Sequence, residues 1–282
     1  MSGGHPDYIR TASEIARQAG ALLLEYLARG VTTEYKGAGT VDVVTAADRA
    51  SEKLIVESLR DAFPDHGIIG EEGSRTQPSG EYLWYVDPLD GTTNFAHGFP
   101  VFCVSIGLAK SNEVIAGVVF DPTRNELFAA ERGAGAMLNG KRIQVSQVAK
   151  LGESLLGTGF PSKKRHLNPN IHFYHQLTLR SHGLRRAGSA ALDLSCVAAG
   201  RYDGYWEFNL NAWDTSAGVL LVEEAGGKVT HVDGSKFDVA ASRDVLATNG
   251  LIHQELMGEM QAVIEGHAEA LPSPPELARP RR

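Results

Sequence analysis

The sequence predicts a layered α/β fold, and three observations predict it. Apolar residues recur at helical spacing over residues 8–28, which indicates a long amphipathic helix. Between residues 83 and 145 the pattern changes to short apolar runs joined by tight turns, and from residue 154 helical and strand-like segments alternate. Helices and sheets of this kind bury their apolar faces by stacking in layers, and 282 residues suffice for a full core.

The N-terminal part predicts helices followed by a sheet. A second helix is expected near residues 45–62, and it opens with Thr45-Ala46-Ala47-Asp48, a capping-box pattern that by itself explains Asp48. A buried strand is expected over residues 83–86. An antiparallel meander of strands should follow at 102–109, 114–120 and 126–130.

The C-terminal part predicts a second set of layers. Strands are expected near residues 154–158, 204–208, 228–232 and 245–248, with helices near 168–181, 189–199, 214–225 and 251–265. We therefore expect an N-terminal α/β half over residues 1–150 and a C-terminal half over 151–265. Residues 266–282 are rich in proline and are expected to form a disordered tail.

Composition excludes several classes of function. The formal net charge is −7 and the basic residues are mostly scattered, which argues against direct binding of nucleic acid. The two cysteines, Cys103 and Cys196, suggest a reducing compartment. No apolar segment approaches the roughly 18 residues that span a bilayer, and the first residues lack a basic and then apolar run. We expect a cytoplasmic protein with no membrane partner.

The most informative segment is Asp87-Pro88-Leu89-Asp90, which directly follows the apolar strand. Pro88 disfavours helix at Asp87 and leaves nearby carbonyl groups without ladder partners, and Mg²⁺ prefers such oxygens together with carboxylates. Gly91 and the amides of Thr92 and Thr93 then suit a phosphate group. A surface turn is the alternative, but apolar residues flank both sides and pull the acids inward, where they need cations.

Two other segments place acids at the ends of elements. Gly70-Glu71-Glu72-Gly73 follows an apolar pair, and Asp214 stands at the start of a helix. A solvated turn explains the first equally well, and an N-cap explains Asp214. By contrast, residues 135–141 match a phosphate-loop spacing, but Arg142 replaces the required Ser or Thr. Asn139-Gly140 is therefore predicted to be a hairpin turn.

Together these segments resemble the inositol monophosphatase family, in its bacterial inositol-1-monophosphatase branch. The resemblance extends over residues 8–262 and rests on the following segments: 41–48, 70–72, 87–100, 188–191, 213–218 and 223–227. It implies a five-layer αβαβα sandwich of the inositol monophosphatase and fructose-1,6-bisphosphatase type. It also implies a homodimer that is inhibited by Li⁺.

The resemblance further implies roles for individual residues. One Mg²⁺ would be held by Glu71, Asp87 and the Leu89 carbonyl, and a second by Asp87, Asp90 and Asp214. Glu71 and Thr92 would position the attacking water, with Asp48 holding the Thr92 hydroxyl. Phosphate would lie on the amides of Gly91, Thr92 and Thr93. Substrate would be contacted by Asp90, the Ala190 amide, Glu207 and Asp214. For Glu207 the alternative is an edge-strand residue that faces water.

The expected function is therefore Mg²⁺-dependent hydrolysis of myo-inositol 1-phosphate, or of a close sugar or polyol phosphate, to the alcohol and inorganic phosphate. One alternative is another small ester, such as fructose bisphosphate, histidinol phosphate or a phosphoadenosine nucleotide. The other is a regulator that keeps the fold and binds transcription or RNA machinery. Intact acids at all the predicted metal positions favour an enzyme.

Overall fold

The computed structural model describes residues 7–30, 33–35, 43–160, 169–241 and 243–270. Its helices are α1 (Tyr8–Arg29), α2 (Ala46–Ala62), α3 (Thr92–Ala96), α4 (Asn170–Arg180), α5 (Ala190–Ala198), α6 (Ala212–Glu224) and α7 (His253–Ile264). Within the described ranges, no helix combines the length and the apolar character needed to cross a membrane. Most of the predicted tail, from residue 271 onward, lies outside the described residues, as does part of the segment 41–48.

The strands form two main sheets. The larger sheet has the order β10-β9-β8-β7-β6-β5-β3-β4 and the smaller has the order β12-β11-β13-β15-β14, while β1 and β2 form a separate pair. The strands are β1 (Thr33–Tyr35), β2 (Val43–Thr45), β3 (Gly67–Gly70), β4 (Arg75–Thr76), β5 (Tyr82–Asp90), β6 (Cys103–Lys110), β7 (Glu113–Asp121), β8 (Glu126–Glu131), β9 (Gly135–Leu138), β10 (Lys141–Arg142), β11 (Leu155–Thr158), β12 (Gly183–Arg185), β13 (Gly204–Phe208), β14 (Lys228–Thr230) and β15 (Asp244–Thr248).

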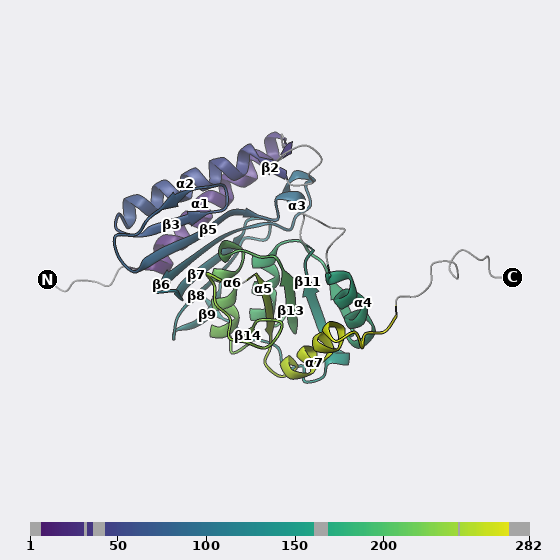
Figure 1. Cartoon of the computed structure of the whole chain (residues 1–282). Helices are drawn as coiled ribbons and strands as arrows, with labels where there is room; N and C mark the ends of the chain where they lie inside the picture. Colours follow the sequence, from purple (N-terminus) through teal and green to yellow (C-terminus); the bar gives the residue numbers. More distant parts are fainter. Residues whose placement is uncertain (1–6, 31–32, 36–42, 161–168, 242, 271–282) are drawn as a thin grey trace.

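The elements stack as five layers, which confirms the predicted αβαβα sandwich (Figure 1). Helices α1 and α2 cover the outer face of the large sheet, α5 and α6 lie between the two sheets, and α4 and α7 cover the outer face of the small sheet. Three apolar clusters fill the spaces between these layers. The alternation of side chains along each strand makes this possible, because each sheet presents an apolar face on both sides.

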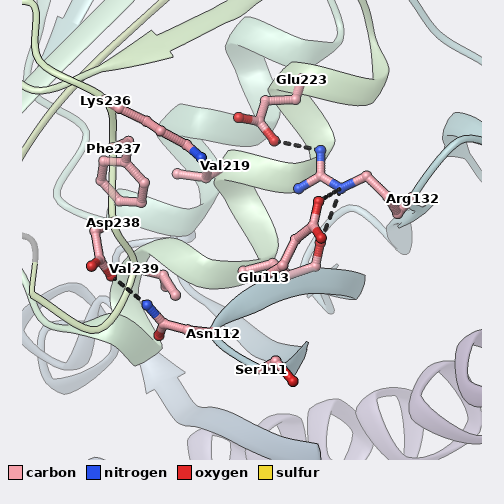
Figure 2. A pocket seen from close by; sticks show the side chains of 11 residues that line it. Ser111, Asn112, Glu113, Arg132, Val219, Glu223, Lys236, Phe237, Asp238 and Val239 are labelled. Carbon is pink, nitrogen blue, oxygen red and sulfur yellow. Dashed lines mark hydrogen bonds and ion pairs between the residues drawn. The ribbon is translucent and has the colours of Figure 1, made fainter.

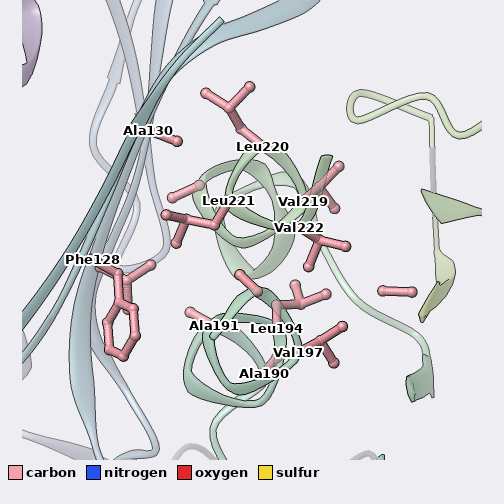
Figure 3. Packing of buried hydrophobic residues seen from close by; sticks show 14 of the residues in the cluster. Phe128, Ala130, Ala190, Ala191, Leu194, Val197, Val219, Leu220, Leu221 and Val222 are labelled. Carbon is pink, nitrogen blue, oxygen red and sulfur yellow. The ribbon is translucent and has the colours of Figure 1, made fainter. Parts of the chain in front are cut away.

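The central helix layer is apolar on nearly every side. Residues 215–222 of α6 are all buried, because a sheet lies on either side of this helix (Figure 3). Leu194 and Val197 of α5 pack beside Leu221 and Val222 of α6. The pair of helices therefore joins the two sheets through one continuous core.

Two strand glycines allow α6 to approach the large sheet closely. Gly107 of β6 and Gly117 of β7 lie opposite each other. A Cβ atom at Gly107 would lie 2.3 Å from Ser216 Oγ, and one at Gly117 would lie 2.8 Å from Ala217 Cα. The absence of side chains at both positions seats the first turns of α6, including Asp214, against the sheet.

The predicted meander is observed: β7 and β8 extend slightly beyond the expected ranges, and β6 is shifted by one residue. The Asn139-Gly140 hairpin turn is also confirmed: it joins β9 to β10, and both residues have positive φ, 48° and 76°. This pair of conformations is the one that a two-residue hairpin loop requires. Residues 135–141 are therefore not a phosphate loop.

Candidate active site

The acid segment at residues 87–90 differs from its prediction. Rather than leaving the sheet as a turn, it continues β5 with an irregular register: Asp87 pairs with Ser105 and Asp90 pairs with Cys103 on β6. One residue more is thus present on β5 than on its partner, which is a β-bulge. Pro88 explains it, because a residue without an N–H group fits a bulge better than a regular ladder.

Helix α2 supports this bulge from the side. The hydroxyl of Ser51 donates to the Pro88 carbonyl at 2.8 Å, and the Leu89 amide donates to Asp87 Oδ1 at 3.0 Å. The buried polar groups that the bulge removes from the ladder thereby gain partners. The backbone around Asp87 is consequently fixed before any ligand arrives.

Asp48 combines the two features predicted for it. It completes the capping box of α2, because the Thr45 amide donates to Asp48 Oδ2 at 2.7 Å. Its other oxygen accepts from the Thr92 hydroxyl at 3.1 Å, and the Leu89 carbonyl lies at the same distance from that hydroxyl. Burial raises the pKa of Asp48, while the hydrogen bonds from Thr45 and Thr92 oppose this shift.

Gly91 turns the chain from β5 into α3. Its φ of +94° lies in the left-handed region, and a Cβ atom would approach the Val101 carbonyl to 2.8 Å. The next residues, Thr92 and Thr93, form the first turn of the short helix α3. Gly91, Thr92 and Thr93 therefore lie consecutively beside the acids, as predicted.

Three carboxyl groups from three parts of the chain lie around the carboxyl of Asp87. Burial raises the pKa of Asp87 well above its usual range, and the charges of Glu71, Asp90 and Asp214 raise it further. Glu71 directly follows β3, which runs parallel to β5, and its amide donates to the Val86 carbonyl at 3.1 Å. The pairing of β3 with β5 thus brings the second predicted acid segment to the first.

Asp90 connects the large sheet to α5. Its Oδ2 accepts hydrogen bonds from the Ser189 hydroxyl and the Ala191 amide, both at 2.7 Å. Burial raises the pKa of Asp90, and these bonds, together with the Ala190 amide, partly offset that increase. Asp90 and Ala190 therefore lie next to each other, as predicted. The shortest backbone hydrogen bond to Asp90 comes from the Ala191 amide.

Asp214 belongs both to the capping box of α6 and to the acid cluster. It accepts from the Asn211 amide at 2.6 Å in the capping box of α6. Burial raises the pKa of Asp214 to about 7, the Asn211 amide opposes the shift, and the charge of Asp90 adds to it. The N-cap is Asn211 and Asp214 is the third residue of α6, so the N-cap interpretation of Asp214 is wrong; its carboxylate still helps to cap the helix, from position N3.

Glu207 lies on β13, in the middle of the small sheet. The edge-strand alternative is therefore wrong. Burial raises the pKa of Glu207 to about 8; a hydrogen bond from Tyr205 opposes the shift, and the charges of Asp90 and Asp214 increase it. Glu207 therefore faces the acid cluster across the interior, although β13 belongs to the other sheet.

The residues fit a hard divalent cation. In the described part of the chain, no three His, Cys, Asp or Glu side chains are already gathered into a coordination shell. Asp90 and Asp214 instead direct one oxygen each to neighbouring donors. Glu71, Asp90 and Asp214 nevertheless lie close enough to Asp87 for their charges to raise its pKa, so protons and cations both stabilise the cluster. A dication would replace such protons on the same oxygens.

The sequence reasoning missed two supporting residues on α2. Ser51 holds the bulge, and Glu52 accepts from the amides of Glu72 and Ser74 at 2.8 and 3.0 Å, which fixes the loop that carries Glu71. Both lie three and four residues after Asp48 and therefore on the same helical face. This spacing could have identified them in the sequence: it places Glu52 on the buried face of the helix, where a carboxylate needs hydrogen-bond donors.

A surface hollow of about 600 Å³ lies at the opposite end of β6 (Figure 2). None of the acids described above lines it. Five of its polar side chains are paired with one another: Arg132 contacts Glu113 and Glu223, and Asn112 donates to Asp238 at 2.8 Å. The acid cluster, not this hollow, is therefore the candidate active site.

Comparison with known proteins agrees with this geometry. A model of the inositol monophosphatase family matches residues 6–265. The inositol-1-monophosphatase of Synechocystis sp. is 46% identical over 257 residues, which cover 90% of this chain and 89% of that protein. The Nus factor SuhB of Pseudomonas aeruginosa is 47% identical over 233 residues, covering 80% and 86%.

A solved structure agrees as well. The inositol monophosphatase from Anabaena superposes with a TM-score of 0.81 at 44% identity, covering 90% of this chain and 95% of that one. Fold, sequence and the arrangement of acids thus lead to one conclusion. The chain belongs to the inositol monophosphatase family and is a phosphatase with the layered fold of that family.

Proposed function

We propose that this phosphatase is a Mg²⁺-dependent phosphomonoesterase that hydrolyses myo-inositol 1-phosphate or a close polyol phosphate. The observation that carries the proposal is the meeting of Glu71, Asp90 and Asp214 around the buried Asp87. Carboxylates that raise one another's pKa are costly unless a cation joins them. A phosphate ester, which is itself an anion, would be drawn to a site only after such cations had bound.

The metal ligands proposed are Glu71, Asp87 and the Leu89 carbonyl for one ion, and Asp87, Asp90 and Asp214 for another. When bound, Mg²⁺ would lower the pKa of water and neutralise charge on the phosphoryl and leaving oxygens. The protein's contribution is to hold these oxygens in place. The bulge fixes Asp87 and Leu89, and the start of α5 fixes Asp90.

Thr92 and Asp48 are proposed to orient the attacking water together with Glu71. The Thr92 hydroxyl has one proton, and Asp48 Oδ1 is one of its two acceptors, at 3.1 Å. With its proton directed there, Thr92 Oγ1 offers lone pairs to a water molecule, so that the water keeps its own lone pair for phosphorus. The capping bonds from Thr45 hold Asp48 still while this occurs.

The remaining groups are proposed to bind the substrate. The amides of Gly91, Thr92 and Thr93 suit the phosphate oxygens, while Asp90, Asp214, Glu207 and the Ala190 amide suit polyol hydroxyls. Glu207 has the clearest support as an acceptor, because its carboxyl lies close enough to Asp90 and Asp214 to be affected by their charges. Loss of this acceptor should weaken substrate binding more than bond cleavage.

Dimerisation, inhibition by Li⁺ and a cytoplasmic location stay predictions from family resemblance. Names among the relatives favour one further candidate function: the Pseudomonas aeruginosa protein that is 47% identical is called a Nus factor. We therefore keep a protein-binding role in transcription as a second proposal. A pull-down with a catalytically silent variant, such as Asp87→Asn, would separate binding from turnover.

A substrate panel tests the main proposal. Purified protein would be assayed with inositol 1-phosphate, fructose 1,6-bisphosphate, histidinol phosphate and a 3′-phosphoadenosine nucleotide, each with Mg²⁺ and with EDTA. The expected result is the highest kcat/KM for inositol 1-phosphate and no turnover in EDTA. Full activity in EDTA would contradict the metal mechanism. A higher kcat/KM for another ester would show that this ester, and not inositol 1-phosphate, is the preferred substrate.

A further inference from the structure

Strands β11 and β13 of the small sheet pack closely against each other beside Glu207. Residues 204–206 of β13 pair in parallel with residues 156–158 of β11, and the register pairs Gly157 with Tyr205. Side chains alternate along a strand, so Tyr205 and Glu207 share one face of β13. That face packs against α5 and α6, since Tyr205 belongs to the central cluster while Trp206 belongs to the outer one.

Tyr205 is held entirely inside the protein. Its side chain has 0% exposure, and its hydroxyl donates a hydrogen bond to Glu207 Oε2. A buried hydroxyl needs a partner, and a carboxylate is a strong acceptor. The bond therefore serves both groups: it satisfies the Tyr205 hydroxyl, and it restricts rotation of the Glu207 carboxylate.

Gly157 of β11 and Gly159, which directly follows the strand, provide the space for this pair. A Cβ atom at Gly159 would lie 2.0 Å from Glu207 Oε2 and 2.2 Å from Oε1, and one at Gly157 would lie 3.3 Å from the Tyr205 ring and 2.9 Å from the Tyr202 ring. The Glu207 carboxylate is thus bounded by the backbone of Gly159 and by the Tyr205 hydroxyl. Neither contact involves a proposed metal ligand.

We propose that Tyr205 and Gly159 position the substrate-selecting carboxylate: Tyr205 holds Glu207 Oε2, and the missing side chain at Gly159 leaves the room that both oxygens need, so that the group is held ready to accept from a hydroxyl of a polyol phosphate. This inference rests on the proposed function, in which Glu207 accepts a hydrogen bond from the substrate. Tyr205 acts through Glu207 and has no part in breaking the phosphate ester bond. An acceptor held in its bound orientation loses less conformational entropy when substrate arrives.

Tyr205→Phe removes the hydroxyl and keeps the buried ring. We expect the KM for inositol 1-phosphate to rise about three- to tenfold, which corresponds to one lost hydrogen bond, with kcat nearly unchanged. Hydrolysis of p-nitrophenyl phosphate, which lacks polyol hydroxyls, should be unaffected. Gly159→Ala should give the same selective loss from the neighbouring strand. Tyr202→Phe is the matched control. It removes a nearby hydroxyl for which the described residues show no hydrogen bond to Glu207, and it should leave kcat and KM unchanged for both substrates.

A double-mutant cycle between Tyr205→Phe and Glu207→Gln tests the coupling, with circular dichroism and thermal unfolding to confirm that each variant is folded. Support requires that Glu207→Gln raises the KM for inositol 1-phosphate and that adding Tyr205→Phe raises it little further. If Glu207→Gln raises the KM while Tyr205→Phe and Gly159→Ala do not, the positioning role is wrong and the proposed function stands. If Glu207→Gln leaves the KM unchanged, the proposed role of Glu207 fails, and the inference fails with it.

Discussion

The affinity of the acid cluster for Mg²⁺ should depend steeply on pH. Burial and the charge of Asp90 raise the pKa of Asp214 to about 7 in the metal-free protein. A carboxyl group with a raised pKa keeps its proton to higher pH, and a proton on a ligand oxygen competes with the metal. Lowering the pH from 8 to 6 should therefore weaken Mg²⁺ binding.

The size of the effect follows from that pKa. Competition by one proton multiplies the apparent Kd by 1 + 10^(pKa − pH), which is about 11 at pH 6 and about 1.1 at pH 8 for a pKa near 7. Asp214 alone thus predicts Mg²⁺ binding that is about tenfold weaker at pH 6 than at pH 8. Asp87, whose pKa is also raised well above its usual range by burial and by the charge of Glu71, should make the dependence steeper.

Isothermal titration calorimetry would measure the pH dependence of the Kd for Mg²⁺ and the release of protons on binding. Titrations of Mg²⁺ at pH 6, 7 and 8, each in two buffers with different ionisation enthalpies, give the Kd and the number of protons released. Asp214→Asn is the control, because it should bind Mg²⁺ more weakly and lose part of the pH dependence. A Kd that stays within twofold between pH 6 and 8, with no protons released, would refute the reasoning about the cluster.

Three other predictions concern single residues. Asp90→Asn should keep the fold and lose most turnover, because an amide is a poorer ligand for a dication; activity within about threefold of the parent at saturating Mg²⁺ would contradict the role. Gly107→Ala should lower the free energy of unfolding by roughly 1–3 kcal/mol, measured in urea, because the new methyl group would meet Ser216; Gly80→Ala, which has open space, should be nearly neutral, and equal effects would count against this account. Burial and the charge of Glu207 raise the pKa of Asp193 well above its usual range, so its contribution to stability is present at low pH and is lost as pH rises. In EDTA, Asp193→Asn should therefore gain stability relative to the parent between pH 5 and 8, and a constant difference between them would exclude this effect.

The sequence alone predicted the layers and the segments that carry the acid cluster. Periodicity along the chain was enough for helices such as α1 and for the strands of the meander, because burial of one face leaves a repeating pattern. The acid segment at residues 87–90 was recognisable because carboxylates, a proline and a glycine occur together beside an apolar strand. Such a segment can be recognised from residues that are adjacent in the chain. The roles assigned to those residues stay predictions.

Only the tertiary structure decided which groups meet. The parallel pairing of β3 with β5 brings Glu71 to Asp87, and the close approach of α6 at Gly107 places Asp214 beside them. The bulge at Pro88 and the contact of Tyr205 with Glu207 were equally invisible in the sequence. The physical reason is that pKa values and hydrogen bonds depend on distances across the core. Those distances are set by sheet register and helix packing, which involve residues far apart in the chain.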